Sequence, residues 1–165
     1  MSKILWFDVE TTGLDPARHG IWQLAFLIEI DGKVVRECNF KMNPTEVEYD
    51  EKALEIGNVT RKELEKEEYQ STVFARVLGI FREYISPFDK SDKFIPAGYN
   101  IKKFDIPFLF AWWERNHDPY LGAFLHFAHI DPGALVGALA GFTGYELPKQ
   151  LKLGQLCKEF GVSLD

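Results

Sequence analysis

Cysteine is scarce in this sequence, and long apolar runs are missing. Cys38 and Cys157 are the only cysteines among 165 residues, and they lack the spacing of a metal site. Two distant cysteines favour reduced thiols in a cytoplasmic protein. Lys3 is followed by only four apolar residues before Asp8, so we expect no signal peptide. No segment approaches the ~20 apolar residues of a membrane span, which excludes a membrane as a partner.

Positive charge is also in short supply, since the net charge is −6 at pH 7. An acidic protein has no long-range attraction for a polyanion. If the substrate is nucleic acid, metal ions and a local basic patch must supply the attraction, which suits binding of a chain end better than coverage of a duplex. Aromatic residues reach 15%, enough to fill a core and to leave some rings for stacking on bases.

The most informative segment covers residues 7–14 and reads Phe-Asp-Val-Glu-Thr-Thr-Gly-Leu. Asp8 and Glu10 follow a short apolar run whose length and content indicate a buried strand. Residues i and i+2 of a strand face the same side, so the two carboxylates lie about 7 Å apart on one face. Two uncompensated anions there repel each other and are costly to desolvate. A divalent cation that prefers oxygen ligands, Mg²⁺ or Mn²⁺, resolves both problems. The alternative of a solvated surface pair is disfavoured by the turn signal that follows.

Periodic patterns place the other elements along the chain, which has no internal repeat and the length of a single domain. The turn signal Asp31-Gly32 makes the first strands antiparallel. Three antiparallel strands followed by strands that alternate with helices predict the α/β class, with a mixed sheet and helices on both faces. The predicted strands cover residues 3–9, 21–30, 33–42, 94–99 and 127–130, and the predicted helices cover 51–56, 60–67, 71–85, 105–116, a segment after Asp131-Pro132, and 151–160.

A second polar segment follows the strand predicted at 94–99. Asn100 falls in the turn, where its side chain can bridge backbone groups. Asp105 begins the next helix, with Pro107 in its first turn. Taken alone, Asp105 is better explained as a helix cap than as a ligand.

Together, Phe-Asp-x-Glu-Thr-Thr-Gly-Leu at 7–14 and Asn-x-x-x-Phe-Asp-x-x-x-Leu at 100–109 resemble the first two motifs of the DEDD (DnaQ-like) 3′–5′ exonucleases. Residues 53–60 and 151–162 also resemble that family, so the resemblance covers essentially the whole chain. It implies a ribonuclease H-like fold and a metal-dependent enzyme that hydrolyses single-stranded DNA or RNA from the 3′ end and releases nucleoside monophosphates. It also implies either a free-standing nuclease or a proofreading subunit whose partner is a DNA polymerase.

The resemblance assigns roles to the carboxylates. Asp8, Glu10 and Asp105 match three of the four ligands that hold two divalent metal ions, Mg or Mn. Asp8 would bridge the two metals, Glu10 would add to one, and Asp105 would anchor the other. Two metals about 3.5–4 Å apart stabilise both the attacking and the leaving oxygens of phosphodiester hydrolysis.

Substrate contacts follow from the same resemblance. Backbone N–H groups of the turn after Glu10 would grip the terminal 3′-hydroxyl, two leucines would wedge against the last base, and an aromatic ring would pack beside the terminal sugar. A role in the core or in a turn is an equal alternative for each residue, and solubility is the better explanation for Lys102 and Lys103. The candidate substrate-binding residues are Thr11, Thr12, Gly13, Leu14, Leu54, Asn100 and Phe104.

The third family motif is missing from its expected place. In the His-type branch, a helix with His-x-x-x-x-Asp carries the general base and the fourth ligand, a short loop after a Phe-Gly-Val segment. The sequence ends at residues 163–165, where that loop should begin. We therefore expect a single exonuclease domain over 1–165 that lacks its C-terminal catalytic helix. The competing hypothesis is a catalytically impaired nucleic-acid-binding or scaffold domain of the same fold, and an unrelated metal phosphatase is a distant third.

One segment imitates the missing motif. His126 and Asp131 have the spacing His-x-x-x-x-Asp, but a helix that put both on one face would run into Pro132 and Gly133. We reject this pair as the third motif and predict that Asp131 caps the following helix. His19, in the loop before the second strand, is expected to be exposed.

Overall fold

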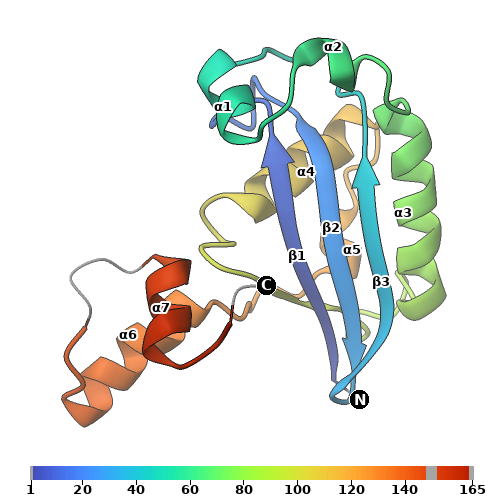
Figure 1. Ribbon diagram of the computed structural model, residues 1–165. Helices are drawn as coiled ribbons and strands as arrows, with labels where there is room; N and C mark the ends of the chain where they lie inside the picture. The colour runs from blue at the N-terminus through green and yellow to red at the C-terminus, as the bar shows by residue number, and fades with distance from the viewer. Residues whose placement is uncertain (1, 148–151, 164–165) are drawn as a thin grey trace.

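The computed structural model describes residues 2–147 and 152–163, and a four-stranded sheet forms its centre (Figure 1). The strands β1, β2, β3 and β4 lie in the order β3-β2-β1-β4. β2 is antiparallel to both β1 and β3, whereas β4 is parallel to β1. The predicted mixed α/β class is confirmed. The strand bounds are β1 (Lys3–Thr11), β2 (Ile21–Ile30), β3 (Lys33–Lys41) and β4 (Ile95–Ala97).

Seven helices occur in the part of the chain that the structure describes. Helices α4 and α5 lie behind the sheet in Figure 1, α3 runs along its β3 side, and α1 and α2 cover one of its ends. Helix α5 was not predicted, and the start predicted for the last helix, Leu151, lies outside the described residues. The helix bounds are α1 (Glu51–Ile56), α2 (Arg61–Leu64), α3 (Gln70–Tyr84), α4 (Asp105–Arg115), α5 (Leu121–Phe124), α6 (Pro132–Thr143) and α7 (Leu153–Glu159).

The alternation along β1 gives the sheet a packed face and an open face. Phe7 and Val9 are buried against the helices, whereas Trp6 is half-buried and Asp8 is exposed on the other side. This is the period-2 pattern of a strand with one face in the core. On the open face, Leu153 of α7 lines a hollow beside Trp6 and Asp8. Helices therefore approach both faces, but they pack fully on one.

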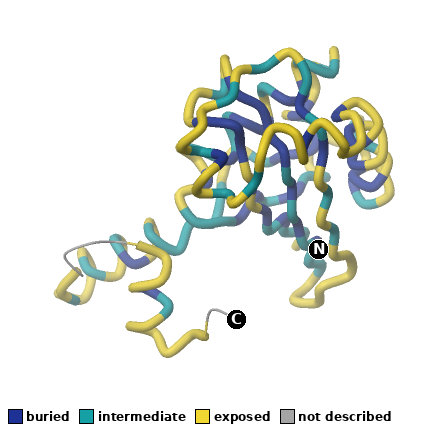
Figure 2. The backbone as a smooth tube through the Cα atoms, turned by 45° about the horizontal axis from the view of Figure 1, so that its top comes forward, coloured by how far each residue is buried: buried dark blue, intermediate teal, exposed yellow. Residues whose placement is uncertain are grey.

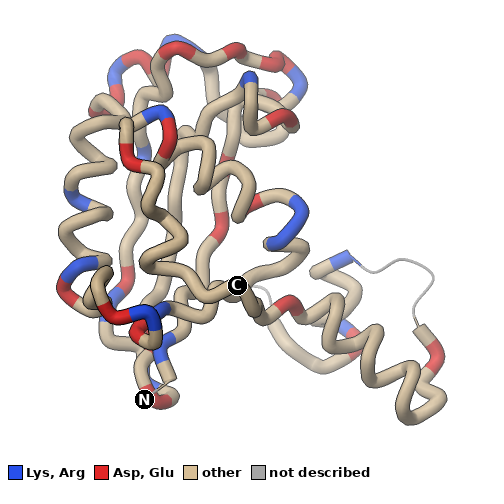
Figure 3. Tube along the Cα trace, turned by 180° about the vertical axis from the view of Figure 1, so that it is seen from behind, with Lys and Arg blue, Asp and Glu red and all other residues tan. Residues whose placement is uncertain are grey.

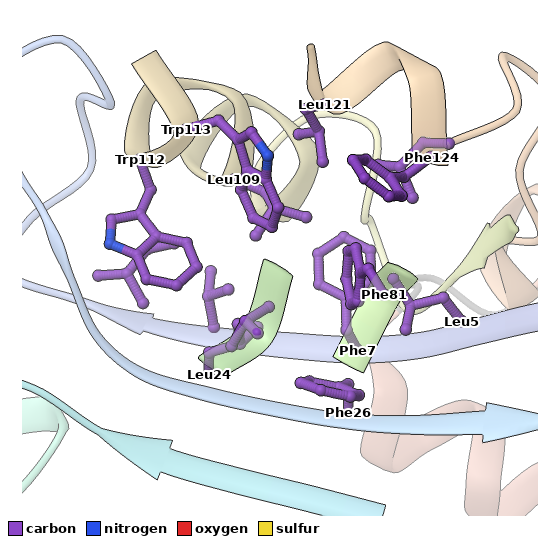
Figure 4. Close-up of a cluster of buried hydrophobic side chains, with 14 of the residues drawn as sticks. Leu5, Phe7, Leu24, Phe26, Phe81, Leu109, Trp112, Trp113, Leu121 and Phe124 are labelled. Atoms are coloured by element: carbon purple, nitrogen blue, oxygen red, sulfur yellow. The ribbon is translucent and has the colours of Figure 1, made fainter. Parts of the chain in front are cut away.

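Aromatic rings and aliphatic side chains together form the core on the packed face (Figure 4). The ring centroid of Phe81 on α3 lies 5.8 Å from Phe26, 5.4 Å from Phe94, 5.6 Å from Trp113 and 5.9 Å from Phe124. Edge-to-face, tilted and stacked pairs such as these add stability beyond the area that they bury. These contacts join α3, α4 and α5 to β2, and they place the tryptophan pair of α4 in the core.

The strand predicted at 127–130 is wrong. The segment meets the edge of β4 through isolated bridges of Leu125 with Phe94 and of Ile130 with Ala97. Between those bridges, the backbone N–H of Ala128 donates to Nδ1 of His126 at 3.0 Å, which turns the chain away from the sheet. A fifth continuous strand therefore does not form.

Helices α6 and α7 project to one side of the sheet in Figures 1, 2 and 3. Helix α6 carries no charged residue, yet Val136 is the only side chain on it that is buried. Leu135, Leu139 and Phe142 of the same helix are exposed. None of the described helices, including α6, is both long enough and apolar enough to cross a membrane.

Candidate active site

Strand β1 presents the two N-terminal carboxylates on the open face of the sheet. Asp8 lies opposite Ala25 of β2 and Glu10 lies opposite Gln23, and the ladder shifts just after Glu10. Both carboxylate side chains are exposed, whereas Val9, the residue between them, points into the core. The predicted placement of both carboxylates on one face of a buried strand is confirmed.

Asp105 reaches the same strand from helix α4. It is the first helical residue and only 4% exposed. Its Oδ1 accepts a hydrogen bond from the backbone N–H of Val9 at 3.1 Å, so its carboxyl group lies at β1 between the positions of Asp8 and Glu10. The residue that precedes the helix is Phe104, which makes no side-chain cap. Asp105 thus ties α4 to β1, and a simple capping role does not describe it.

Burial, and at two of the sites neighbouring negative charge, raises the pKa values of the three carboxyl groups. Burial, followed by the charge of Asp8 and then that of Glu10, raises the pKa of Asp105 to about 7, although the Val9 amide opposes the shift. Loss of hydration also raises the pKa of Asp8, and hydration loss together with the charge of Asp8 raises the pKa of Glu10. Both side chains reach solvent, yet the protein around them excludes enough water to penalise their charge. No lysine or arginine of the described residues contributes to these shifts.

This donor set suits a hard divalent cation. All three groups supply carboxylate oxygen, the ligand type that Mg²⁺ and Mn²⁺ prefer. Within residues 2–147 and 152–163, however, no three His, Cys, Asp or Glu side chains converge as a preassembled metal-binding group. Asp8, Glu10 and Asp105 share one region and interact electrostatically, but they do not already surround a common point.

The turn after Glu10 is held by its own threonines. Thr11 Oγ1 donates to the Gly13 carbonyl at 2.7 Å. Thr12 Oγ1 donates to the Glu48 carbonyl at 2.6 Å and accepts from the Gly20 N–H at 3.0 Å. The Thr12 N–H donates to the Gly20 carbonyl at 2.9 Å, so this amide is already engaged. The two threonine hydroxyls therefore shape the turn.

The expectation that His19 is exposed is wrong. His19 is buried, and the backbone N–H of Asp15 donates to its Nδ1 at 3.1 Å. A Cβ atom on Gly13 would lie 2.2 Å from the His19 ring, so the missing side chain of Gly13 makes room for the imidazole. The glycine of the first motif thus has a packing reason.

Leu14 and Leu54 have different surroundings. Leu14 is 78% exposed directly after the turn. Leu54 is buried in a small cluster with Trp22 and Leu64, which is the core role that the sequence left as its alternative. Of the two leucines, Leu14 is the one free to meet a ligand.

Asn100 and Phe104 frame the turn before Asp105. Asn100 is exposed and has a left-handed backbone with φ 56°, a conformation that asparagine adopts more easily than most residues. The Phe104 ring is half-buried, with its centroid 5.0 Å from that of Phe108. Both residues shape the approach of α4 to the carboxylates.

The prediction that Asp131 caps a helix is confirmed. Asp131 Oδ1 accepts from the Gly133 N–H at 2.9 Å at the start of α6. His126 accepts from Ala128 in a turn, so no helix carries both His126 and Asp131 on one face. The pair is therefore not the third motif.

Sequence reasoning did not predict that residues after α5 would lie beside the turn at Asn100. Tyr99 and His129 line a hollow of about 580 Å³ together with Asn100 and Lys102. His129 is distant from the other three in sequence and meets them because residues 125–130 run along the edge of β4. No local pattern marks such a neighbour.

Comparison with protein families matches residues 5–164 to the RNase_T family, described as Exonuclease. Comparison with curated proteins gives no match. Among solved structures, E. coli exonuclease I in complex with a dT13 oligonucleotide has a TM-score of 0.77 and 22% identity, over 99% of this chain and 36% of that chain. An ExoI/SSB-Ct complex has a TM-score of 0.80 and 20% identity, over 99% and 37%. A product-bound structure of exonuclease I has a TM-score of 0.78 and 20% identity, over 99% and 39%. These likenesses show the fold, and this chain spans between 36% and 39% of the length of those solved chains.

Proposed function

This chain belongs to the RNase_T family of exonucleases, and from that membership we propose that it is a metal-dependent 3′–5′ exonuclease acting on single-stranded nucleic acid. One observation carries the proposal. Asp105 bonds to the Val9 amide between Asp8 and Glu10, so three oxygen donors gather beside a strand end in the order of the family's motifs. The dT13 oligonucleotide bound by E. coli exonuclease I supports a single-stranded substrate.

In this proposal, Asp8, Glu10 and Asp105 hold two divalent cations, Mg or Mn. When bound, the cations would stabilise the developing charge on the attacking and leaving oxygens. The carboxylates provide the negative charge that recruits the cations to an acidic protein, and Asp105 fixes α4 against β1 so that the donors stay together. The turn at residues 11–13 and the exposed Leu14 would receive the 3′-terminal nucleotide, and Phe104 would flank its sugar.

The proposal also concerns the general base, the fourth metal ligand, the substrate and the partner. The general base and fourth carboxylate of the His-type branch have no counterpart in the described part of the chain, where His126 and Asp131 serve a turn and a cap. The proposed substrate is single-stranded DNA or RNA, and a DNA polymerase is a proposed partner. Both cysteines are free thiols, which fits the cytoplasmic location that we propose.

A second candidate function is favoured by the lack of three converging ligands within the described residues. It is a catalytically impaired domain of the same fold that binds nucleic acid without cutting it. A general base alone contributes about 10²–10⁴-fold to rate. A domain without one would therefore hydrolyse nucleic acid far more slowly, while its binding of nucleic acid would not depend on that base.

Digestion of a 5′-labelled single-stranded oligonucleotide with Mg²⁺ or Mn²⁺ tests the proposal. We expect a metal-dependent ladder that shortens from the 3′ end, and its loss in Asp8→Ala. The matched control is Glu114→Ala, which removes an exposed carboxylate from α4, the helix of Asp105, and should leave the ladder unchanged. No cleavage in the wild-type protein, with Mn²⁺ binding still measurable by calorimetry, would contradict the exonuclease and favour the binding domain.

A further inference from the structure

A basic hollow of about 550 Å³ lies at the edge of β4, outside the carboxylate cluster. We call it the β4-edge hollow. It lies between α4 and residues 125–129, and no described Asp or Glu lines it. Its lining includes Lys90, Lys93, Lys102, Phe110, Phe127 and His129.

The charge of the β4-edge hollow is opposite to that of the protein as a whole. Three lysines line it without a carboxylate, although the chain has a net charge of −6. Lys90 and Lys102 are exposed, whereas Lys93 is anchored to the wall because its Nζ donates to the Gly122 carbonyl at 2.5 Å. An acidic protein that binds a polyanion needs such a local basic patch.

Aromatic rings stand among these lysines. Phe127 is 91% exposed, and the centroid of its ring lies 4.5 Å from that of the His126 ring. Phe110 of α4 is also exposed on the other side of the hollow. A solvent-facing ring beside lysines is the arrangement with which proteins bind single strands, since bases stack on the ring while phosphates meet the cations.

A series of hollows with shared lining residues leads from the β4-edge hollow to Asp8. The hollow that contains Asp8 shares Tyr99 with the one at Asn100. That second hollow shares Lys102 and His129 with the β4-edge hollow. A strand whose 3′ end lies at the carboxylates can therefore continue over the turn at residues 100–103 and reach Phe127.

We propose that the β4-edge hollow is a second strand-binding subsite, which holds nucleotides on the 5′ side of the terminal one. Lys90 and Lys102 meet backbone phosphates, and a base stacks on Phe127. The inference rests on the proposed exonuclease function, which puts a 3′ end at Asp8. An acidic peptide matches the lysines too, but it does not account for the series of hollows that leads to Asp8.

Binding of fluorescently labelled dT4 and dT12, measured by anisotropy in EDTA, tests the subsite without cleavage. We expect Phe127→Ala to weaken dT12 binding about tenfold, within the range for loss of one base stack, and to leave dT4 binding unchanged. Phe142→Ala is the matched control, because Phe142 is also 91% exposed but lies on α6. Lys90→Ala should lower the slope of log K against log salt by about 0.7, the value for one single-strand phosphate contact, whereas Lys33→Ala at the β2–β3 turn should not.

The outcomes separate this inference from the proposed function. Equal dT12 binding by the wild-type protein and Phe127→Ala would overturn the subsite, while metal-dependent trimming of dT4 would leave the exonuclease standing. Displacement of dT12 by an oligoglutamate at equal charge and concentration would also overturn it, because the hollow would then bind acidic peptides. If the wild-type protein neither binds nor trims either oligonucleotide, both the exonuclease and the subsite fail.

Discussion

Apolar side chains are buried where helices pack on the sheet, but many of them are exposed on the projecting helices α6 and α7. On α3, Phe81 is 1% exposed and contacts four other rings. On α6, Phe142 is 91% exposed although its helix carries no charge. The difference shows that apolar composition does not by itself make a core. A helix becomes part of one when another element offers a complementary face.

The candidate active site follows this division. Asp8, Glu10 and Asp105 all lie on elements anchored in the core. Few residues of the projecting pair come near them: Leu153 lines the same hollow as Asp8, and Gly133 lines the next one. The proposed metal ligands therefore have rigid supports, which a two-metal site needs in order to hold its geometry.

The largest expected difference comes from removing one ring in each region. Phe81→Ala should lower the free energy of unfolding by about 3–5 kcal/mol, because it empties the centre of the aromatic cluster. Phe142→Ala should change it by less than about 0.5 kcal/mol, since an exposed ring loses few contacts. Urea denaturation followed by fluorescence measures both, and Phe81→Leu, a smaller truncation, serves if Phe81→Ala does not fold. A loss of several kcal/mol in Phe142→Ala would show that α6 is buried in solution.

The parts of the site that follow from a local pattern could be predicted from the sequence. The apolar run before Asp8 determines a strand, and the strand's period puts Glu10 on the same face. The parts that depend on distant neighbours could not be predicted. His19 is buried because Gly13 leaves space for its ring, and His129 reaches Lys102 because the chain returns along β4.

The strand predicted at 127–130 shows the same limit. Its residues are compatible with a strand, but a hydrogen bond from the backbone N–H of Ala128 to the His126 side chain competes with the sheet ladder and turns the chain. The prediction that Asp131 caps a helix is confirmed. It could be made because Pro132 and Gly133, directly after Asp131, are local signals of a helix start.

The buried carboxyl group should make the anchored region sensitive to pH. In the folded protein the pKa of Asp105 is about 7, above its ordinary value of 3.8. The folded state therefore binds this proton more tightly than the unfolded state, so without metal the free energy of unfolding falls as pH rises from about 4 to 7 and levels off above. At ~1.4 kcal/mol per pH unit, the loss is on the order of 4 kcal/mol.

Asp105→Asn isolates this effect, since the amide does not titrate in that range. Unfolding in urea between pH 4 and 8, in EDTA, should show the decline in the wild-type protein and a flatter curve in the variant. Glu114→Gln, which changes an exposed carboxylate on the same helix, should follow the wild-type curve. Parallel curves for the wild-type protein and Asp105→Asn would mean that Asp105 is ionised and stabilised by a partner.

The smallest expected effects come from replacing a glycine by alanine in each region. The change in stability should have opposite signs in the two regions. Gly13→Ala places a methyl group 2.2 Å from the His19 ring and should lower the free energy of unfolding by about 1–3 kcal/mol through overpacking. Gly137→Ala on α6 meets nothing within 4 Å and should stabilise that helix by about 0.5–1 kcal/mol, because glycine is unfavourable in a helix interior. Urea denaturation reports the first change, and slower amide hydrogen exchange in α6 reports the second. Destabilisation by Gly137→Ala would show that the small residue receives a close neighbour in solution, and the contrast between the anchored and the projecting region would then disappear.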